Sequence, residues 1–143
     1  MERPRLSGEF EHALDPKGRL TLPARFRDYF SRGAVAVRLL ETESCIRIYT
    51  PEDWQEFDSR HLADLDEFGD EKATWKIRRI YGNLDEVEPD RQGRILLSAQ
   101  RIKELGLNGK VMIRGARTHL EIWDPETYYA ELEKARAKEE DDA

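Results

Sequence analysis

The stretch DPKGRLTLPARF (Asp15–Phe26) returns 75 residues later as DRQGRILLSAQR (Asp90–Arg101). Both copies keep an aspartate, a glycine three residues on, an arginine directly after that glycine, and leucine or isoleucine beyond it. Two later pairs of segments match in the same order: AVAVR (34–38) with KVMIR (110–114), and CIRIYTPEDW (45–54) with HLEIWDPETY (119–128). Ordered repetition of this kind predicts two copies of one structural unit of roughly 50 residues.

The repeated segment predicts a strand, a tight turn and a returning strand in each copy. GEFEHAL (8–14) alternates polar and apolar residues, as a half-buried strand does. In DPKG, aspartate at the first position of the turn, proline at the second and glycine at the fourth favour a tight turn. The returning strands place their apolar residues on one face: Leu20, Leu22, Ile95 and Leu97.

Short helices are predicted after both returning strands and after the last strand of each copy. The first pair spans Pro23–Phe30 and Ser98–Leu105. The second pair begins at Thr50-Pro51 and at Asp124-Pro125, where a capping side chain precedes a proline at the first helical position.

Residues 70–82 (DEKATWKIRRIYG), between the copies, are predicted to form a helix that ends at glycine. Its buried face is expected to hold four residues: Ala73, Ile77, Ile80 and Tyr81. A second stripe faces solvent, phosphate or a partner subunit, and it consists of Lys72, Lys76 and Arg79. The tail KARAKEEDDA (134–143) is expected to be a fraying helix that runs into disorder.

The predicted fold class is α+β, with repeated units at residues 7–54 and 83–126. A helical segment at 55–82 connects them, and a C-terminal helix with an acidic tail follows at 127–143. About 50 residues with four or five short strands give only a marginal core. The two units are therefore expected to pack on each other as one interleaved β-barrel around a pseudo-twofold axis.

Charge is segregated along the chain, which has a formal net charge of -6. Residues 1–40 carry a net +3 and residues 71–120 a net +5, and these two basic blocks hold the repeated motif. We find no apolar run of membrane-spanning length and no signal-peptide pattern, so a soluble cytoplasmic protein is expected. The one cysteine, Cys45, has no partner for an internal disulfide, which fits a reducing compartment.

Catalytic and metal-binding patterns are not found in the sequence. The three histidines, His12, His61 and His119, lie far apart with no metal-ligand spacing, and one cysteine makes no thiolate cluster. No phosphate-binding or dinucleotide-binding glycine loop is present. We therefore expect no enzyme activity, no cofactor, no metal and no small-molecule substrate.

A cationic edge around the first turn favours nucleic-acid binding. Lys17 lies at the apex of the turn, Arg19 directly follows it, and Arg25 and Arg27 lie on the next helix. Such an edge suits phosphate positioning with one or two base contacts from arginine. Arg94 is the second-copy counterpart of Arg19 and is a further candidate.

The motif aspartates have a structural explanation. Asp15 and Asp90 stand four residues before Arg19 and Arg94, and they are expected to hold these guanidinium groups by bidentate pairs across the hairpin. Together with Gly18 and Gly93 they are predicted to shape the two loops rather than to form a catalytic carboxylate pair.

The sequence resembles the MraZ family of bacterial proteins, which are built of two SpoVT/AbrB-like domains. The resemblance rests on four segments from about Gly8 to about Tyr128: GEFEHALDPKGRLTLPARFR, IRIYTPEDW, GNLDEVEPDRQGRILLSAQ and LEIWDPETY. It implies two tandem swapped-hairpin AbrB-like repeats that form a double-split β-barrel with short flanking helices. It also implies assembly into a closed homo-oligomeric ring.

The resemblance further implies a function. Members of the family are sequence-specific transcriptional regulators, usually repressors, in the cytoplasm and on the nucleoid. Their DNA partner is a set of tandem promoter repeats upstream of the division and cell-wall gene cluster. The family's DNA-contacting lysine and arginine match Lys17 and Arg19 here, and its loop-shaping residues match Asp15 and Gly18.

A second hypothesis belongs to a different class of function. In it, the chain is an oligomeric protein-interaction scaffold without specific DNA binding, in which the arginines only stabilise hairpins and the acidic segments recruit partners. The two hypotheses differ in what Arg19 contacts.

Overall fold

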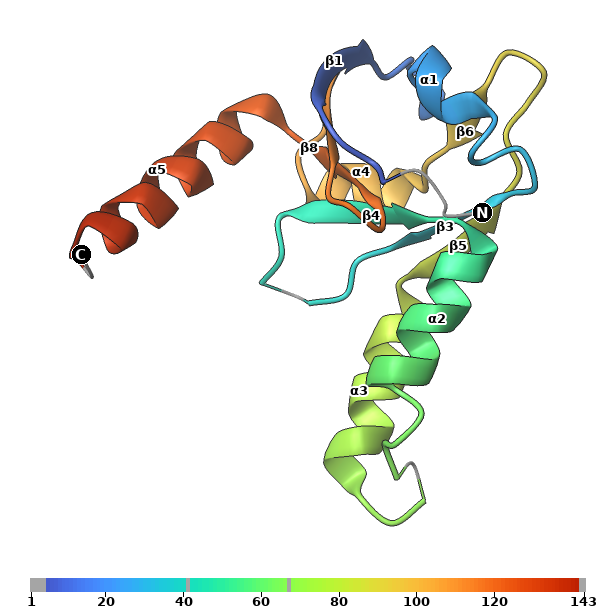
Figure 1. The fold of residues 1–143 in the computed structure, drawn as a ribbon, viewed down its shortest axis with the longest axis vertical. Coiled ribbons are helices and arrows are strands. Elements are labelled where there is room, and N and C mark those ends of the chain that lie inside the picture. Colours follow the sequence, from blue (N-terminus) through green and yellow to red (C-terminus); the bar gives the residue numbers. More distant parts are fainter. Residues whose placement is uncertain (1–4, 41, 67, 142–143) are drawn as a thin grey trace.

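The computed structural model describes residues 5–40, 42–66 and 68–141, and it contains the same succession of elements twice (Figure 1). The first copy comprises β1 (Glu9–Ala13), β2 (Arg19–Thr21), α1 (Ala24–Arg27), β3 (Ala34–Val37), β4 (Cys45–Tyr49) and α2 (Pro51–His61). The second comprises β5 (Leu84–Val87), β6 (Arg94–Leu96), α4 (Ala99–Glu104), β7 (Lys110–Gly115), β8 (Leu120–Trp123) and α5 (Pro125–Asp141). The helix α3 (Glu71–Gly82) connects them. The predicted duplication and the α+β class are both confirmed.

Most strand pairs join one copy to the other. A six-stranded antiparallel sheet has the order β1-β7-β8-β4-β3-β5, and β2 pairs with β6 in a separate ribbon. The first strand of each copy pairs with the third strand of the other, as β1 with β7 and β5 with β3. At the centre β4 pairs with β8, so that Ile46 lies opposite Ile122. Neither copy therefore completes its sheet alone.

The single β-barrel expected from the sequence is not found as a closed ring: the strands of the described residues form two sheets. The larger sheet ends on β1 and β5, and a single bridge, Leu14 with Leu20, links the end of β1 to the ribbon. The ribbon strands have only three residues each. This length is too short for them to pair along both edges of the larger sheet.

The main core lies between the six-stranded sheet and the β2–β6 ribbon. It takes fully buried side chains from both copies, among them Leu20, Ile95, Ile113 and Ile122. A second apolar cluster lies on the other face of the sheet, where α2 and α3 cover β3 and β4. It contains Val35, Val37, Tyr49, Trp54, Leu62 and Ile80.

Helix ends follow the local sequence closely. Thr50 Oγ1 accepts a hydrogen bond from the Asp53 N–H at 3.0 Å, and Asp124 Oδ2 accepts one from the Thr127 N–H at 3.1 Å. These side chains cap α2 and α5 as predicted. The predicted helix at 23–30 is shorter, since α1 ends at Arg27 and turns carry the chain on to Gly33, which has a φ of 128°.

The buried face of α3 is narrower than the sequence predicts. Ala73 and Ile80 are buried and Ile77 is half-buried, but Tyr81 is 45% exposed. The prediction for Tyr81 is wrong because α3 packs along α2 on one side only, in a hairpin that projects from the sheet (Figure 1). The Tyr81 hydroxyl instead donates to Asp58 at 2.8 Å.

The helix α5 starts on the sheet and then leaves it. Tyr128 is buried against Trp123, whereas nearly all residues beyond it are exposed (Figure 1). The helix continues to Asp141, so the residues expected to fray are helical over their described part; 142 and 143 lie outside it. No helix in the described part of the chain combines the length and the apolar character needed to cross a membrane.

Candidate nucleic-acid interface

The first turn is fixed by one carboxylate. Asp15 Oδ1 accepts hydrogen bonds from the backbone N–H groups of Lys17 at 2.9 Å and Arg19 at 2.8 Å. Asp15 Oδ2 accepts from Arg19 Nε at 2.6 Å. Gly18, with a φ of 86°, adopts the left-handed conformation that the turn requires. The turn therefore presents Lys17 on a rigid backbone.

The second turn repeats this geometry. Asp90 Oδ1 accepts from the N–H groups of Gln92 and Arg94, both at 2.9 Å, and its Oδ2 accepts from Arg94 Nε at 2.7 Å. Gly93 has a φ of 74°. In both turns the aspartate binds its arginine through one guanidinium nitrogen and uses the other oxygen for the backbone. The bidentate pair expected from the sequence is therefore not the geometry observed.

Both aspartates should make the fold sensitive to acid. The backbone N–H of Arg19 lowers the pKa of Asp15 most strongly, and the N–H of Arg94 does the same for Asp90. A carboxyl group whose pKa is lower in the folded state stabilises the fold above its unfolded pKa, and that stability is lost as the pH falls through the folded pKa.

We therefore expect the double variant Asp15→Asn, Asp90→Asn to lose less stability than the wild type between about pH 5 and about pH 3. Urea midpoints across this range measure the slope. Asparagine keeps the side-chain oxygen that accepts the turn N–H groups, so the turn itself should persist. Asp28→Asn, at an exposed site outside both turns, is the control and should keep the wild-type slope. An unchanged slope in the double variant would contradict this role.

The two turns lie at opposite ends of the β2–β6 ribbon. The ribbon is antiparallel, with Arg19 opposite Leu96 and Thr21 opposite Arg94. At one end the Leu97 N–H donates to the Gly18 carbonyl at 2.8 Å, and at the other the Leu22 N–H donates to the Gly93 carbonyl at 3.0 Å. Each turn is thus bonded to the segment that leads into the helix of the other copy.

This arrangement separates cations that the sequence predicts to lie together. A Cβ atom at Gly18 would come within 3.0 Å of Ile102 in α4, whereas one at Gly93 would come within 2.7 Å of Arg27 in α1. Arg27 therefore lies beside the second turn and away from Lys17, because α1 follows the far end of β2. The single edge predicted around the first turn is divided between two sites.

The first turn carries two of the candidate residues. The Lys17 side chain is exposed, and the Arg19 side chain is 36% exposed. Within the described residues, Arg19 donates to Asp15 through Nε, while its Nη1 and Nη2 atoms make no hydrogen bond. The arginine thus stabilises the hairpin and keeps two donor nitrogens for a ligand.

The second turn gathers more positive charge than the sequence predicts. Arg27 and Arg94 lie at this end of the ribbon, and Arg91, exposed within the turn, joins them. Arg91 occupies the position that Pro16 has in the first copy. This difference between the copies is the sequence feature that could have predicted the second basic site. Arg25 lies over two aromatic rings, with its guanidinium carbon 5.2 Å from the centre of the Phe26 ring and 5.7 Å from that of Phe10.

Arg101 is a buried cation that sequence reasoning missed. It is 7% exposed, its Nη2 donates to the Gly82 carbonyl at 2.9 Å, and its Nη1 lies 3.3 Å from Glu104. It thereby ties α4 to the end of α3. Arg101 occupies the position that Phe26 has in the first copy. This difference between the copies is the sequence feature that points to a special role for Arg101.

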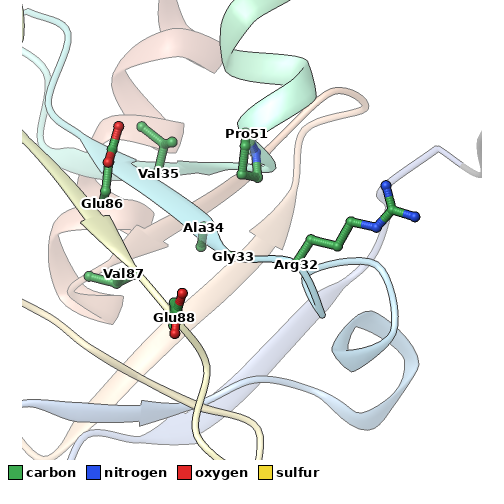
Figure 2. A pocket seen from close by; sticks show the side chains of 8 residues that line it. All are labelled: Arg32, Gly33, Ala34, Val35, Pro51, Glu86, Val87 and Glu88. Carbon is green, nitrogen blue, oxygen red and sulfur yellow. The ribbon is translucent and has the colours of Figure 1, made fainter.

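The outer side of β5 is acidic and unlike either turn. A groove of about 440 Å³ runs beside this edge strand between Arg32 and the carboxylates of Glu86 and Glu88 (Figure 2). Pro51 and Val87 line its apolar part. Because Arg32 lies 3.6 Å from Glu52, its charge is compensated within the chain. Phosphate would be repelled here, so the basic turns remain the candidate surface.

Comparisons with known proteins agree with the duplicated architecture. Residues 6–75 and 80–143 both match the family described as "MraZ protein, putative antitoxin-like". A transcriptional regulator MraZ of Thermomicrobium roseum is 35% identical over 131 residues, covering 92% of this chain and 89% of that protein. One of Heliobacterium modesticaldum is 35% identical, covering 90% and 87%. One of Roseiflexus castenholzii is 37% identical, covering 82% and 80%. The chain therefore belongs to the MraZ family.

Proposed function

We propose that this chain is a sequence-specific DNA-binding transcriptional regulator whose main contact is the first turn. The observation that carries the proposal is the rigid Asp15 turn, which presents Lys17 and the free Nη atoms of Arg19. The relatives named transcriptional regulator MraZ support the same function. The function needs no catalysis and no cofactor.

The chemistry of the turn suits a double helix. Lys17 is a flexible point charge that suits a phosphate group, while a guanidinium with two free nitrogens suits a guanine edge or a phosphate. A backbone already held by Asp15 loses little conformational entropy on binding. Arg94 and Arg27 form the second basic site, and Arg25 adds charge on α1; we propose these as secondary phosphate contacts.

A single subunit would bind DNA weakly, because its net charge is -6 and each basic site is small. We propose that subunits form a closed ring that presents several first turns to tandem promoter repeats. Simultaneous contacts then raise the affinity through effective concentration. The proposed target is the promoter of the division and cell-wall gene cluster, with repression as the outcome, in the cytoplasm and on the nucleoid.

The proposal assigns a role to each part of the chain. Residues 7–54 and 83–126 are the two AbrB-like domains, and we propose that their sheet and ribbon pack as the two halves of a double-split β-barrel with swapped hairpins. Residues 55–82 are the connecting helical segment, and 127–143 are the C-terminal helix and acidic tail. The interleaved pairing of β1 with β7 and of β5 with β3 supports the swapped description.

The direct test is a fluorescence-anisotropy titration with DNA from immediately upstream of the protein's own gene. We expect tight binding that weakens as salt is raised, and weak binding to scrambled DNA of the same length. Equal weak binding to both DNAs would overturn the proposal. Because Arg19 also binds Asp15, that result would favour the scaffold hypothesis, in which the arginine serves only the hairpin.

A further inference from the structure

A polar cluster lies at the centre of the molecule, away from both turns. In β4, Ile46 and Ile48 point into the main core, so Cys45 and Arg47 lie on the opposite face of the sheet. Glu121 of β8 stands directly opposite Arg47. The cluster therefore joins the first copy to the second at the pair of strands in the middle of the sheet.

Three ligand-type side chains meet in this cluster. One ligand atom each from Glu43, Cys45 and Glu121 lies within 4.8 Å of the other two. Cys45 is fully buried, and the side chains of Glu43 and Glu121 are only 13% and 17% exposed. Arg47 Nη2 lies 2.7 Å from Glu43 and offsets one of these two buried carboxylates, so the charge of the other would favour a further cation among the three side chains.

In each of the two carboxylates, only one oxygen accepts a hydrogen bond from the described residues. Glu43 Oε1 accepts from Arg47 Nε at 2.8 Å, while its Oε2 is buried without a hydrogen-bond partner in the described residues. Glu121 Oε1 accepts from Trp123 Nε1 at 3.1 Å, and its Oε2 lies 3.8 Å from His119 Nε2. In metal sites, outer partners fix one atom of a ligand in this way and leave the other for the ion.

His119 supplies the independent sign of a missing ligand. It is 8% exposed, and its Nδ1 lies 3.1 Å from Thr118 Oγ1. Its Nε2 is buried and has no hydrogen-bond partner in the described part of the chain, yet it faces the Glu121 carboxylate. Buried polar atoms normally have a partner, so two without one around one cluster mark a place for a bound ion or water molecule.

We propose that Glu43, Cys45 and Glu121 bind a zinc-class divalent cation, with His119 as the fourth donor. Thiolate, imidazole and carboxylate together suit a borderline-soft ion that prefers four ligands. Ligand atoms around tetrahedral zinc lie closer together than 4.8 Å, so Glu43, Cys45 and Glu121 must approach one another by about 1 Å. His119 Nε2 lies 3.8 Å from Glu121 and must also turn toward the other two ligands. Carboxylate side chains make such a shift by rotating about their own bonds.

The charges of the proposed ligands and of Arg47 favour a divalent cation at this site. Cys45 is fully buried and enters the site as a thiol. Binding replaces the S–H bond with a metal–sulfur bond and releases that proton to water. The ion, the thiolate, the two carboxylates and the Arg47 guanidinium then sum to zero charge. The ion clamps β4 to β8 and thereby joins the two copies.

The test uses cadmium as a spectroscopic probe of the full-length protein after treatment with a chelator. We expect the ultraviolet absorption of a cadmium–thiolate bond to saturate at one ion per chain. Because the chain has one cysteine, this band reports Cys45 alone. Cys45→Ser should abolish the band, and His119→Ala should weaken cadmium binding at least about tenfold, since loss of even an outer partner of a ligand has that effect. His61→Ala, at an exposed histidine outside the cluster, is the control and should bind as the wild type does.

Thermal unfolding with zinc provides a second readout. Zinc should raise the melting temperature of the wild type and of His61→Ala, but not that of Cys45→Ser or Glu121→Gln. Two variants, Cys45→Ser and Glu121→Gln, are used because the test still works if one of them fails to fold. A wild-type protein with no cadmium–thiolate band, or a zinc-induced shift that survives in Cys45→Ser, would overturn the site.

Discussion

Lys17→Gln should weaken binding to the operator DNA by about tenfold for each subunit that contacts it, and should leave the fold intact. The salt dependence should weaken as well, with the slope of log K against log salt falling by about one for each contacting subunit. Because several identical turns bind at once in the proposed ring, these losses multiply. This is the largest effect on function that we expect from a single substitution.

The choice of glutamine follows from the repeat. Gln92 occupies the position of Lys17 in the second turn, whose Asp90 and Gly93 geometry is the same, so the first turn should tolerate it. Anisotropy titrations at several salt concentrations measure the loss, and thermal unfolding checks the fold. Lys138→Gln removes the same charge from the exposed part of α5 and should leave affinity nearly unchanged. Equal losses in both variants would mean that net charge, rather than the turn, determines binding.

Ile122→Ala should cost about 2–5 kcal/mol of folding free energy, the largest stability effect that we expect. Ile122 is fully buried in β8 and lies opposite both Ile46 and Ile113. Its removal leaves a cavity between the two copies, where β4 and β8 meet, and neighbouring strands fixed by hydrogen bonds cannot collapse into it. The melting temperature should fall by about 10 °C.

Urea unfolding of Ile122→Ala and the wild type measures this cost. Leu96→Ala is the matched control, since Leu96 is also an aliphatic strand residue but is 56% exposed. It should change stability by no more than about 0.5 kcal/mol. A cost below about 1 kcal/mol for Ile122→Ala would be inconsistent with a core shared by both copies.

Local features of the fold were predictable because a few neighbouring residues decide them. Asp15 and Gly18 specify a turn within four residues, and Thr50 or Asp124 before a proline specifies a helix start. The failures have a non-local cause. Tyr81 matches the apolar spacing of α3, yet it is exposed, because its burial depends on where α2 lies and not on the sequence of α3.

The sequence predicted only the part of the candidate surface that neighbouring residues form. Lys17 and Arg19 belong to one turn, so their proximity follows from their positions in the sequence. Arg27 is only eight residues from Arg19, yet it lies at the other end of the ribbon beside Gly93. The three residues of β2 carry the chain from one end of the ribbon to the other, and only the pairing partner determines what the chain meets there.

By itself, the sequence determined that the protein is duplicated, that its halves interleave, and that each half contains an aspartate-capped turn followed by an arginine. Repetition, turn chemistry and helix caps are properties of short segments, and they act before the chain is folded. Only the tertiary structure decided which turn each helix covers, and that Glu43 and Cys45 meet Glu121 and His119. These residues come from different copies, and antiparallel pairing of β4 with β8 is what brings them together.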